Sequence, residues 1–206
     1  MKKKGIIILL IAVIVGLISL YFDAQIVEKV SFLRGDILDE VFLGVTFVSS
    51  EVIILLILTS LFMWREHKRK WVLPLWVSSL LAVMVSFLLK VGVQRLRPFQ
   101  QEIVETLPLL IKENFIIWNY SFPSFQAMLA FCSIPILSKE FPRFKYVWIV
   151  FACLIAFSRV YFGVHFLSDV IFGAIIGYLI GEFVMYGEKE KKLWTRIYER
   201  IFYGEK

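Results

Sequence analysis

Charged residues are scarce in this chain of 206 residues: they make up 19% of it, whereas hydrophobic residues make up 59%. A soluble domain of this length carries more charge and fewer long apolar runs, so the composition excludes an ordinary soluble protein. There is also no internal repeat and no low-complexity tract to mark a boundary. We therefore expect residues 1–206 to form a single membrane domain.

Cysteine is nearly absent as well, since the chain contains only Cys132 and Cys153, both inside apolar runs. This usage predicts buried free thiols, with no disulfide framework and no zinc site. The net charge is +6, but the basic residues cluster beside apolar runs and form no stripe interleaved with exposed aromatics. Such clusters indicate contact with membrane lipids and exclude a nucleic-acid partner.

Six apolar segments are long enough, or nearly so, to cross a bilayer of about 30 Å as helices. They cover residues 5–22, 41–63, 72–93, 123–138, 145–162 and 168–186. The fold class predicted is therefore all-α, a bundle of six transmembrane helices, although the fourth segment is short and contains Pro135. The first segment has an alternative as a cleaved signal peptide. We favour an uncleaved helix because no clear A-x-A-like site follows it.

Basic residues lie on one side of this predicted bundle. They concentrate at the N-terminus, in the second and fourth connections and in the tail, whereas the first connection is mainly acidic. The positive-inside rule then predicts a multi-pass protein of the cytoplasmic membrane with both termini in the cytoplasm. The connections at 23–40, 94–122 and 163–167 face outward. The tail at 188–204 has apolar residues at spacings of three and four, which favours an amphipathic helix on the inner leaflet over a solvated one.

The first segment with candidate chemistry runs from Lys90 to Pro98, at the outer end of the third span. Lys90 and Arg97 are seven residues apart, which is two helical turns and one face. Pro98 disfavours a helical conformation at Arg97, so we expect the helix to end there. The structural alternative is a snorkelling lysine and an interfacial arginine, and Arg95 is also interpreted as interfacial.

The second segment runs from Ser121 to Gln126, where the fourth span begins. Ser121 is a plausible N-cap, with Pro123 in the first turn of the helix. The free amides of this helix start would then face outward and favour an anion. An ordinary capped helix without a ligand is the alternative.

The third segment runs from Ser158 to Asp169 and joins the last two spans on the outer side. His165 and Asp169 are four residues apart, so on a helix they share a face. A carboxylate at that spacing can accept the imidazole Nδ1–H, which leaves Nε2 as a nucleophile or base. A lone histidine near a membrane surface is usually structural. One paired with a carboxylate and preceded by Arg159 indicates a phosphate site.

These three segments resemble the motifs of the type 2 phosphatidic acid phosphatase (PAP2) family, which read K-x6-R-P, P-S-G-H and S-R-x5-H-x3-D. The first and third motifs match fully, and their order matches as well. The resemblance covers about residues 41–186 and implies a PAP2/haloperoxidase-like core.

The resemblance also implies a role for each residue. Lys90, Arg97 and Arg159 would hold the phosphate oxygens, with Ser124 and Phe125 in the same phosphate-binding set. His165 would attack phosphorus and form a phosphohistidine, with Asp169 orienting the ring. The family needs neither a metal nor a cofactor, because three cations neutralise the phosphoryl charge.

The second motif departs from the family pattern, because Phe125 and Gln126 stand where the family has glycine and histidine. The family histidine protonates the leaving alkoxide. Gln126, at this general-acid position, can form hydrogen bonds but cannot donate a proton as an acid does, and losing an acid costs about 10²–10⁴-fold in rate. A pyrophosphate leaving group tolerates the loss better than an alkoxide.

The sequence supports two functions of different classes. The first is a lipid phosphatase or pyrophosphatase at the outer face, and the resemblance implies phosphatidylglycerol phosphate, phosphatidic acid or undecaprenyl pyrophosphate as substrate. The second is a catalytically impaired PAP2-like protein that binds a lipid phosphate without efficient hydrolysis. A transporter is disfavoured, since no pair of broken helices or mid-span charges is evident.

Overall fold

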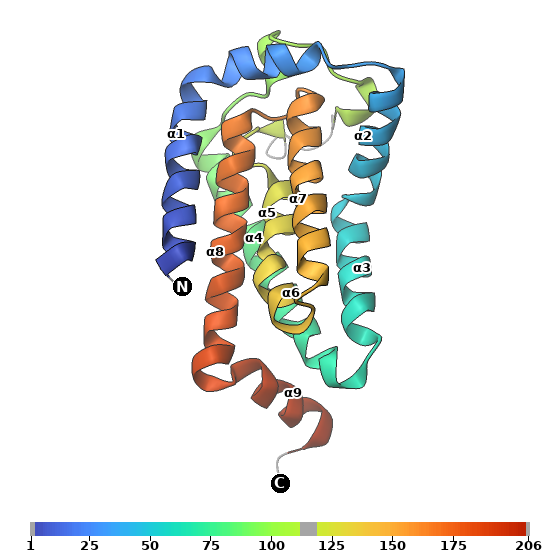
Figure 1. The fold of residues 1–206 in the computed structure, drawn as a ribbon, viewed down its shortest axis with the longest axis vertical. Coiled ribbons are helices and arrows are strands. Elements are labelled where there is room, and N and C mark those ends of the chain that lie inside the picture. The colour runs from blue at the N-terminus through green and yellow to red at the C-terminus, as the bar shows by residue number, and fades with distance from the viewer. Residues whose placement is uncertain (1–2, 112–118, 205–206) are drawn as a thin grey trace.

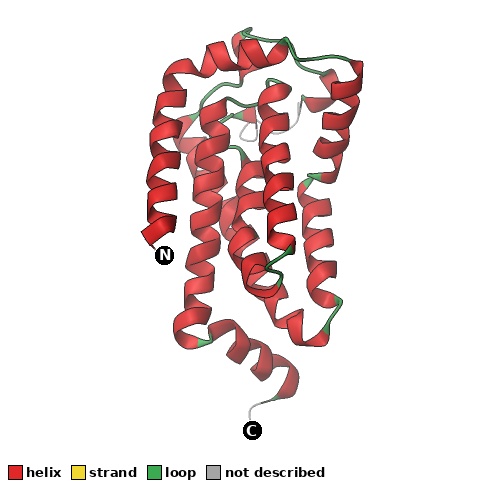
Figure 2. Cartoon of the chain, in the orientation of Figure 1, coloured by secondary structure: helices red, strands yellow, loops and turns green. Residues whose placement is uncertain are grey.

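The computed structural model describes residues 3–111 and 119–204 of the chain. Helices account for all the regular structure in these residues (Figures 1 and 2). The α-helices are α1 (Lys3–Ser31), α2 (Asp36–Val48), α3 (Glu51–Met63), α4 (Val72–Val93), α5 (Phe125–Cys132), α6 (Ile134–Glu140), α7 (Phe144–Tyr161), α8 (Leu167–Lys191) and α9 (Leu193–Tyr203). Among the described residues, short 3-10 helices are η1 (Glu66–Trp71), η2 (Pro98–Gln101) and η3 (Pro108–Leu110).

The all-helical class is confirmed, but the described helices do not clearly show the six spans expected. Four helical stretches in the described residues are long and apolar enough to cross a membrane, or five if the bent pair α2 and α3 counts as one. The expected fourth span, at residues 123–138, is divided into α5 and α6 at Ser133. The division fits the position of Pro135, which lies in the first turn of α6 and has no N–H to continue α5.

The first connection also differs from the prediction, because α1 continues to Ser31 and does not end near residue 22. No glycine or proline interrupts this part of the chain. Val27 is fully buried and Asp23 is only 3% exposed, so the extension packs against the rest of the bundle. Asp23 therefore belongs to a helix that contacts α8 and not to an exposed loop.

Three glycines on α8 allow α5 to pack unusually close to it in the middle of the bundle (Figure 1). A Cβ atom at Gly177 would lie 2.2 Å from the Met128 carbonyl oxygen, and one at Gly181 would lie 2.2 Å from that of Cys132. Gly173 meets the carbonyl oxygen of Ser124 in the same way, at 2.7 Å. The contact sets the start of α5 beside the start of α8.

The two cysteines differ in exposure. Cys132 is a buried free thiol, as predicted, whereas the free thiol Cys153 is exposed on α7. The prediction for Cys153 was wrong because an apolar run on a membrane helix has an outward face as well as a core face. Tyr146, Val147 and Val150 are exposed on the same helix, and exposed apolar surface of this kind is normal for a helix that contacts lipid.

Candidate active site

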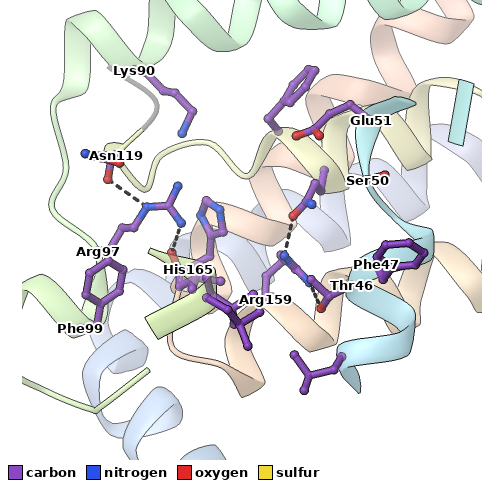
Figure 3. Close-up of a pocket in the computed structure, with 16 residues that line it drawn as sticks. Thr46, Phe47, Ser50, Glu51, Lys90, Arg97, Phe99, Asn119, Arg159 and His165 are labelled. Atoms are coloured by element: carbon purple, nitrogen blue, oxygen red, sulfur yellow. Dashed lines mark hydrogen bonds between the residues drawn. The ribbon is translucent and has the colours of Figure 1, made fainter. Parts of the chain in front are cut away.

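A cavity of about 300 Å³ lies where α4, α5, α7 and the bend between α2 and α3 meet the loops (Figure 3). Six of the eight residues predicted for the site line it: Lys90, Arg97, Phe125, Gln126, Arg159 and His165. The other described lining residues are mainly apolar and include Leu43, Phe47, Leu109 and Leu110. The cavity therefore has one cationic wall and one apolar wall, which suits an amphipathic ligand with a phosphate head.

Lys90 and Arg97 reach the cavity in a different way from the one predicted. Helix α4 ends at Val93 and not at Arg97, because Gln94 adopts a left-handed conformation with φ of 51°. Lys90 is 1% exposed and its Nζ donates a hydrogen bond to the Tyr120 carbonyl. Arg97 follows on extended backbone, with φ of −76° and ψ of 156°. The two cations thus meet across a turn of the chain and not along one helix face.

Backbone carbonyls hold the guanidinium group of Arg97. Its Nε donates to the Asn119 carbonyl at 2.9 Å and its Nη1 to the Val164 carbonyl at 3.1 Å. Both acceptors are neutral carbonyls, so they orient the guanidinium group of Arg97 without neutralising its charge. An arginine held in this way is prepared for an anion.

Arg159 comes from α7 and is 4% exposed. Its Nη1 donates to Gln126 Oε1 at 2.7 Å, its Nη2 donates to Thr46 Oγ1, and its Nε donates to Ser158 Oγ at 3.2 Å. These contacts join α7 to α5 and to α2. Gln126 therefore acts here as an acceptor that orients an arginine.

His165 lies between the guanidinium groups of Arg97 and Arg159, with its ring in the cavity (Figure 3). It follows Gly163, whose φ of +66° turns the chain after α7. Burial lowers the pKa of His165 well below its ordinary value of 6.5, and the positive charges of Arg97, Lys90 and Arg159 lower it further. The imidazole is therefore neutral at physiological pH, which is the nucleophilic form.

The predicted hydrogen bond between His165 and Asp169 is not formed in this structure. The two groups are neighbours, but Nδ1 and Oδ2 are 3.8 Å apart. Helix α8 begins only at Leu167, so His165 precedes the helix whose face the two were expected to share. Asp169 Oδ2 instead accepts the Phe166 N–H at 2.8 Å.

Arg95, which the sequence analysis interpreted as interfacial, forms a buried polar cluster behind His165. Its Nη1 lies 2.8 Å from Asp169 Oδ1 and its Nη2 lies 2.7 Å from Asp23 Oδ2. Its guanidinium carbon also lies 4.0 Å from the centre of the Phe166 ring. The signal in the sequence was an aspartate, Asp23, at the end of the first apolar run, but the assignment of residues 23–40 to an exposed connection concealed it.

The start of α5 is one turn later than predicted. Ser124 and not Ser121 is the N-cap residue, and its side chain makes no capping bond. The Ser124 N–H donates to the Asp169 carbonyl at 3.0 Å, while its Oγ is buried with no hydrogen-bond partner among the described residues. Ser121 instead fixes the preceding loop, since its N–H donates to the Arg95 carbonyl at 2.7 Å. The described lining of the cavity includes neither Ser124 nor Asp169.

The bend between α2 and α3 supplies lining residues that sequence reasoning missed. Thr46, Ser50 and Glu51 all border the cavity, and the two helices meet at an angle of 64°. The polar stretch from Ser49 to Glu51, in the middle of the apolar run at 41–63, is the signal that could have revealed them. Within the described ranges, no group of three or more histidine, cysteine or acidic residues is placed to hold a metal ion.

Comparison with known proteins supports the family resemblance that the motifs indicated. The profile of the PAP2 superfamily matches residues 71–192. Phosphatidylglycerophosphatase B of Bacillus subtilis is 29% identical over 190 residues, covering 82% of this chain and 84% of that protein. Undecaprenyl-diphosphatase of Sulfolobus acidocaldarius is 31% identical over 120 residues, covering 58% of this chain and 56% of that protein.

Two crystal structures share the fold. A transmembrane PAP2 type phosphatidylglycerolphosphate phosphatase from Bacillus subtilis superimposes with a TM-score of 0.69 and 24% identity, covering 89% of this chain and 98% of that one. LpxE of Aquifex aeolicus gives a TM-score of 0.63 and 27% identity, covering 80% and 95%. The family inferred from the motifs is thus confirmed, and the chain belongs to the PAP2 superfamily of membrane phosphatases.

Proposed function

We propose that this protein hydrolyses the phosphate or diphosphate of a membrane lipid through a covalent intermediate on His165. The observation that supports this most directly is the position of the His165 ring between Arg97 and Arg159, with Lys90 lining the same cavity (Figure 3). The apolar wall formed by Leu43, Phe47 and Leu110 suits the lipid part of such a substrate. Relatives whose names specify phosphatidylglycerophosphate and undecaprenyl diphosphate support these two lipids as first candidates.

In the proposed reaction, Lys90, Arg97 and Arg159 bind the phosphate oxygens and offset the charge that develops on them. His165 Nε2 attacks phosphorus, and the leaving oxygen departs from the opposite side. Water then attacks the phosphohistidine and releases inorganic phosphate. Asp169 is placed to stabilise the imidazolium if the 3.8 Å separation shortens when the anion binds.

The proposed topology retains six crossings, with α5 and α6 together making the fourth. Both termini would then be cytoplasmic, and the cavity would lie near the outer face. Helix α9 begins after the left-handed residue Lys192 and exposes Ile201, Phe202 and Tyr203, which supports an amphipathic tail on the inner leaflet. The whole chain would be one domain, with its PAP2-like core at about residues 41–186.

The alternative is a protein that binds a lipid phosphate without efficient hydrolysis. It is favoured by Gln126, which has no proton to give to a leaving alkoxide and which is engaged by Arg159.

Phosphate release by the purified protein from a lipid monophosphate and a lipid diphosphate separates these functions. Release that falls by at least about a thousandfold in His165→Ala supports the enzyme, since the residue that carries the covalent step is removed. If the protein releases no phosphate but binds lipid phosphate, and binding weakens in Arg159→Ala, the binding function is correct. A Phe125→Gly, Gln126→His double variant should raise monoester turnover by about tenfold or more.

A further inference from the structure

The cavity contains one negatively charged side chain among the lining residues that the structure describes, and this is Glu51. Glu51 is the first residue of α3, directly after the bend that follows α2. Its carboxylate points into the cavity, across from Lys90 (Figure 3). A carboxylate therefore borders the space in which three cations and His165 would hold a phosphate.

A negative charge in a phosphate site is unfavourable for binding unless it has a task, because like charges in a partly buried site repel. Glu51 is also close enough to Arg159 for their charges to attract, so it offsets part of the charge that binds the anion. Glutamine would keep the shape of the side chain but would lack both the charge that attracts Arg159 and the ability to exchange a proton. Besides its charge, glutamate therefore supplies this position with a group that can hold and release a proton.

The residue in the general-acid position cannot supply that proton. Gln126 Oε1 accepts a hydrogen bond from Arg159 at 2.7 Å, and the amide has no transferable proton. Glu51 and Gln126 line the same cavity, from α3 and α5 respectively. The chain thus has an acid–base group in the same cavity as the position where its second motif lacks one.

We propose that Glu51 carries out both proton transfers of the reaction. This inference rests on the proposed function of the cavity as a phosphatase site. The substrate enters as a phosphate monoanion and passes its proton to the Glu51 carboxylate. In the first step His165 Nε2 forms a bond to phosphorus, the bond from phosphorus to the leaving oxygen breaks, and the Glu51 carboxyl gives this proton to that oxygen. In the second step a water oxygen attacks phosphorus, Glu51 takes a proton from the water, and the P–N electron pair returns to Nε2. The Glu51 carboxyl returns its proton to the departing phosphate and is a carboxylate again, so the cycle balances.

Glu51→Gln tests this role because the change keeps the shape of the side chain and removes only the ionisable group. The matched control is Glu40→Gln, the same chemical change at an exposed residue of α2 that is not among the described cavity residues. The substrates are an alkyl monophosphate lipid, an aryl phosphate and a lipid diphosphate, whose leaving groups need progressively less protonation. We expect turnover of Glu51→Gln to fall by about 100-fold or more on the alkyl ester and by less than about tenfold on the diphosphate.

Two further measurements distinguish proton transfer from a structural effect. Gln126→His added to Glu51→Gln should restore alkyl ester turnover, since an acid then returns to the family's general-acid position in the same cavity. Inorganic phosphate should inhibit Glu51→Gln at the same or a lower concentration than it inhibits the parent protein, because a negative charge has been removed.

Equal losses on all three substrates, especially with weaker inhibition by phosphate, would show a structural role and overturn the proposal. So would unchanged turnover in Glu51→Gln. These outcomes leave the proposed function intact, provided that His165→Ala is inactive. An unmodified protein that releases no phosphate from any substrate would instead overturn the proposed function, and this inference with it.

Discussion

Two groups of residues around the cavity, here called the fixed wall and the bend wall, are held in place differently. The fixed wall consists of Arg97 and His165 with Arg95 and Asp169 behind them, and its polar groups are held by buried carboxylates and backbone carbonyls. The bend wall consists of Thr46, Ser50 and Glu51 with Phe125 and Gln126, and all five are partly exposed. It is formed by a helix pair bent by 64° and by the first turn of α5.

This difference matches the pattern of agreement with the family motifs. Arg97, His165 and Asp169 on the fixed wall all agree with the family pattern, whereas both departures, at Phe125 and Gln126, lie on the bend wall. In the proposed reaction the attacking group must approach phosphorus along one line, and the contacts of the fixed wall hold its residues for that approach. A side chain that contacts the leaving group of the substrate can be supplied from more than one position on the bend wall. We infer that the fixed wall determines whether reaction occurs and the bend wall determines which leaving group is tolerated.

The largest expected effect is that of Asp169→Asn, which removes a negative charge from the fixed wall with little change in side-chain volume. The variant loses the charge that faces Arg95 at 2.8 Å and His165 at 3.8 Å. We expect turnover to fall by about 10²–10⁴-fold on every substrate, because the proposed role of the carboxylate, to stabilise the imidazolium, does not depend on the leaving group. Steady-state phosphate release measures this. A loss confined to alkyl esters would contradict the division between the walls.

Replacing Arg95 with methionine should have the next largest effect. Asp169 would then be a buried carboxylate without its cation, and Asp23 on α1 would lose the same partner. We expect a lower thermal midpoint in detergent and a turnover reduced by about tenfold to 100-fold, since an unpaired buried charge is costly.

Asp23→Asn is the comparison for this variant, because it leaves the contact between Arg95 and Asp169 in place. It should lower the thermal midpoint less and reduce turnover by less than about tenfold. Equal effects of Asp23→Asn and Arg95→Met would mean that the cluster serves only to attach α1, and that it does not support Asp169.

The sequence allowed the chemistry of the fixed wall to be predicted better than its geometry. The spacing of Lys90 and Arg97 predicted one helix face, but Gln94 terminates α4 and the two residues meet across a turn. The spacing of His165 and Asp169 predicted a helical pair, but α8 starts after His165. Motif spacing thus identified which residues come together in the site. It could not predict the local backbone that brings them together, because that backbone depends on tertiary contacts.

The bend wall could not be predicted in the same way. Thr46 and Glu51 belong to no motif, and they reach the cavity only because α2 and α3 meet at an angle inside a run that reads as one apolar span. Arg95 and Asp23 were missed for a similar reason, since their pairing joins residues 72 positions apart. A hydrophobic run shows that a helix is buried in lipid or protein, but it does not show where the helix bends or which polar group it brings to a partner.

The pH dependence of kcat/KM tests whether Arg97 on the fixed wall lowers the pKa of His165. Burial and then Arg97 lower the pKa of His165 below 6.5, so the ring is neutral above that lowered pKa and becomes protonated as the pH falls through it. We expect kcat/KM to be constant near pH 6.5 and to fall about tenfold per pH unit below the lowered pKa.

Arg97→Gln removes a positive charge beside the ring and should move this acidic limb to higher pH. An acidic limb at or above pH 6.5 in the unmodified protein would contradict the neutral imidazole. No movement of the limb in Arg97→Gln would show that Arg97 does not act on the charge of His165.

The smallest expected effect is on the bend wall, where Thr46→Val removes one of the acceptors that orient Arg159. The two side chains have nearly the same shape, so packing is retained and only the hydrogen bond is lost. A single hydrogen bond to a charged group contributes about 1.5–3 kcal/mol, but Gln126 still accepts from the same guanidinium group at 2.7 Å. We therefore expect inorganic phosphate to bind about threefold to tenfold more weakly, with little change in the pH profile.

Thr59→Val is the control, since the Thr59 hydroxyl accepts a hydrogen bond from Trp76 at 3.0 Å on the same bent helix pair but outside the described cavity lining. If Thr46→Val lowers turnover as strongly as Asp169→Asn does, Arg159 belongs functionally to the fixed wall, and its contacts with α2 are as essential as those behind His165.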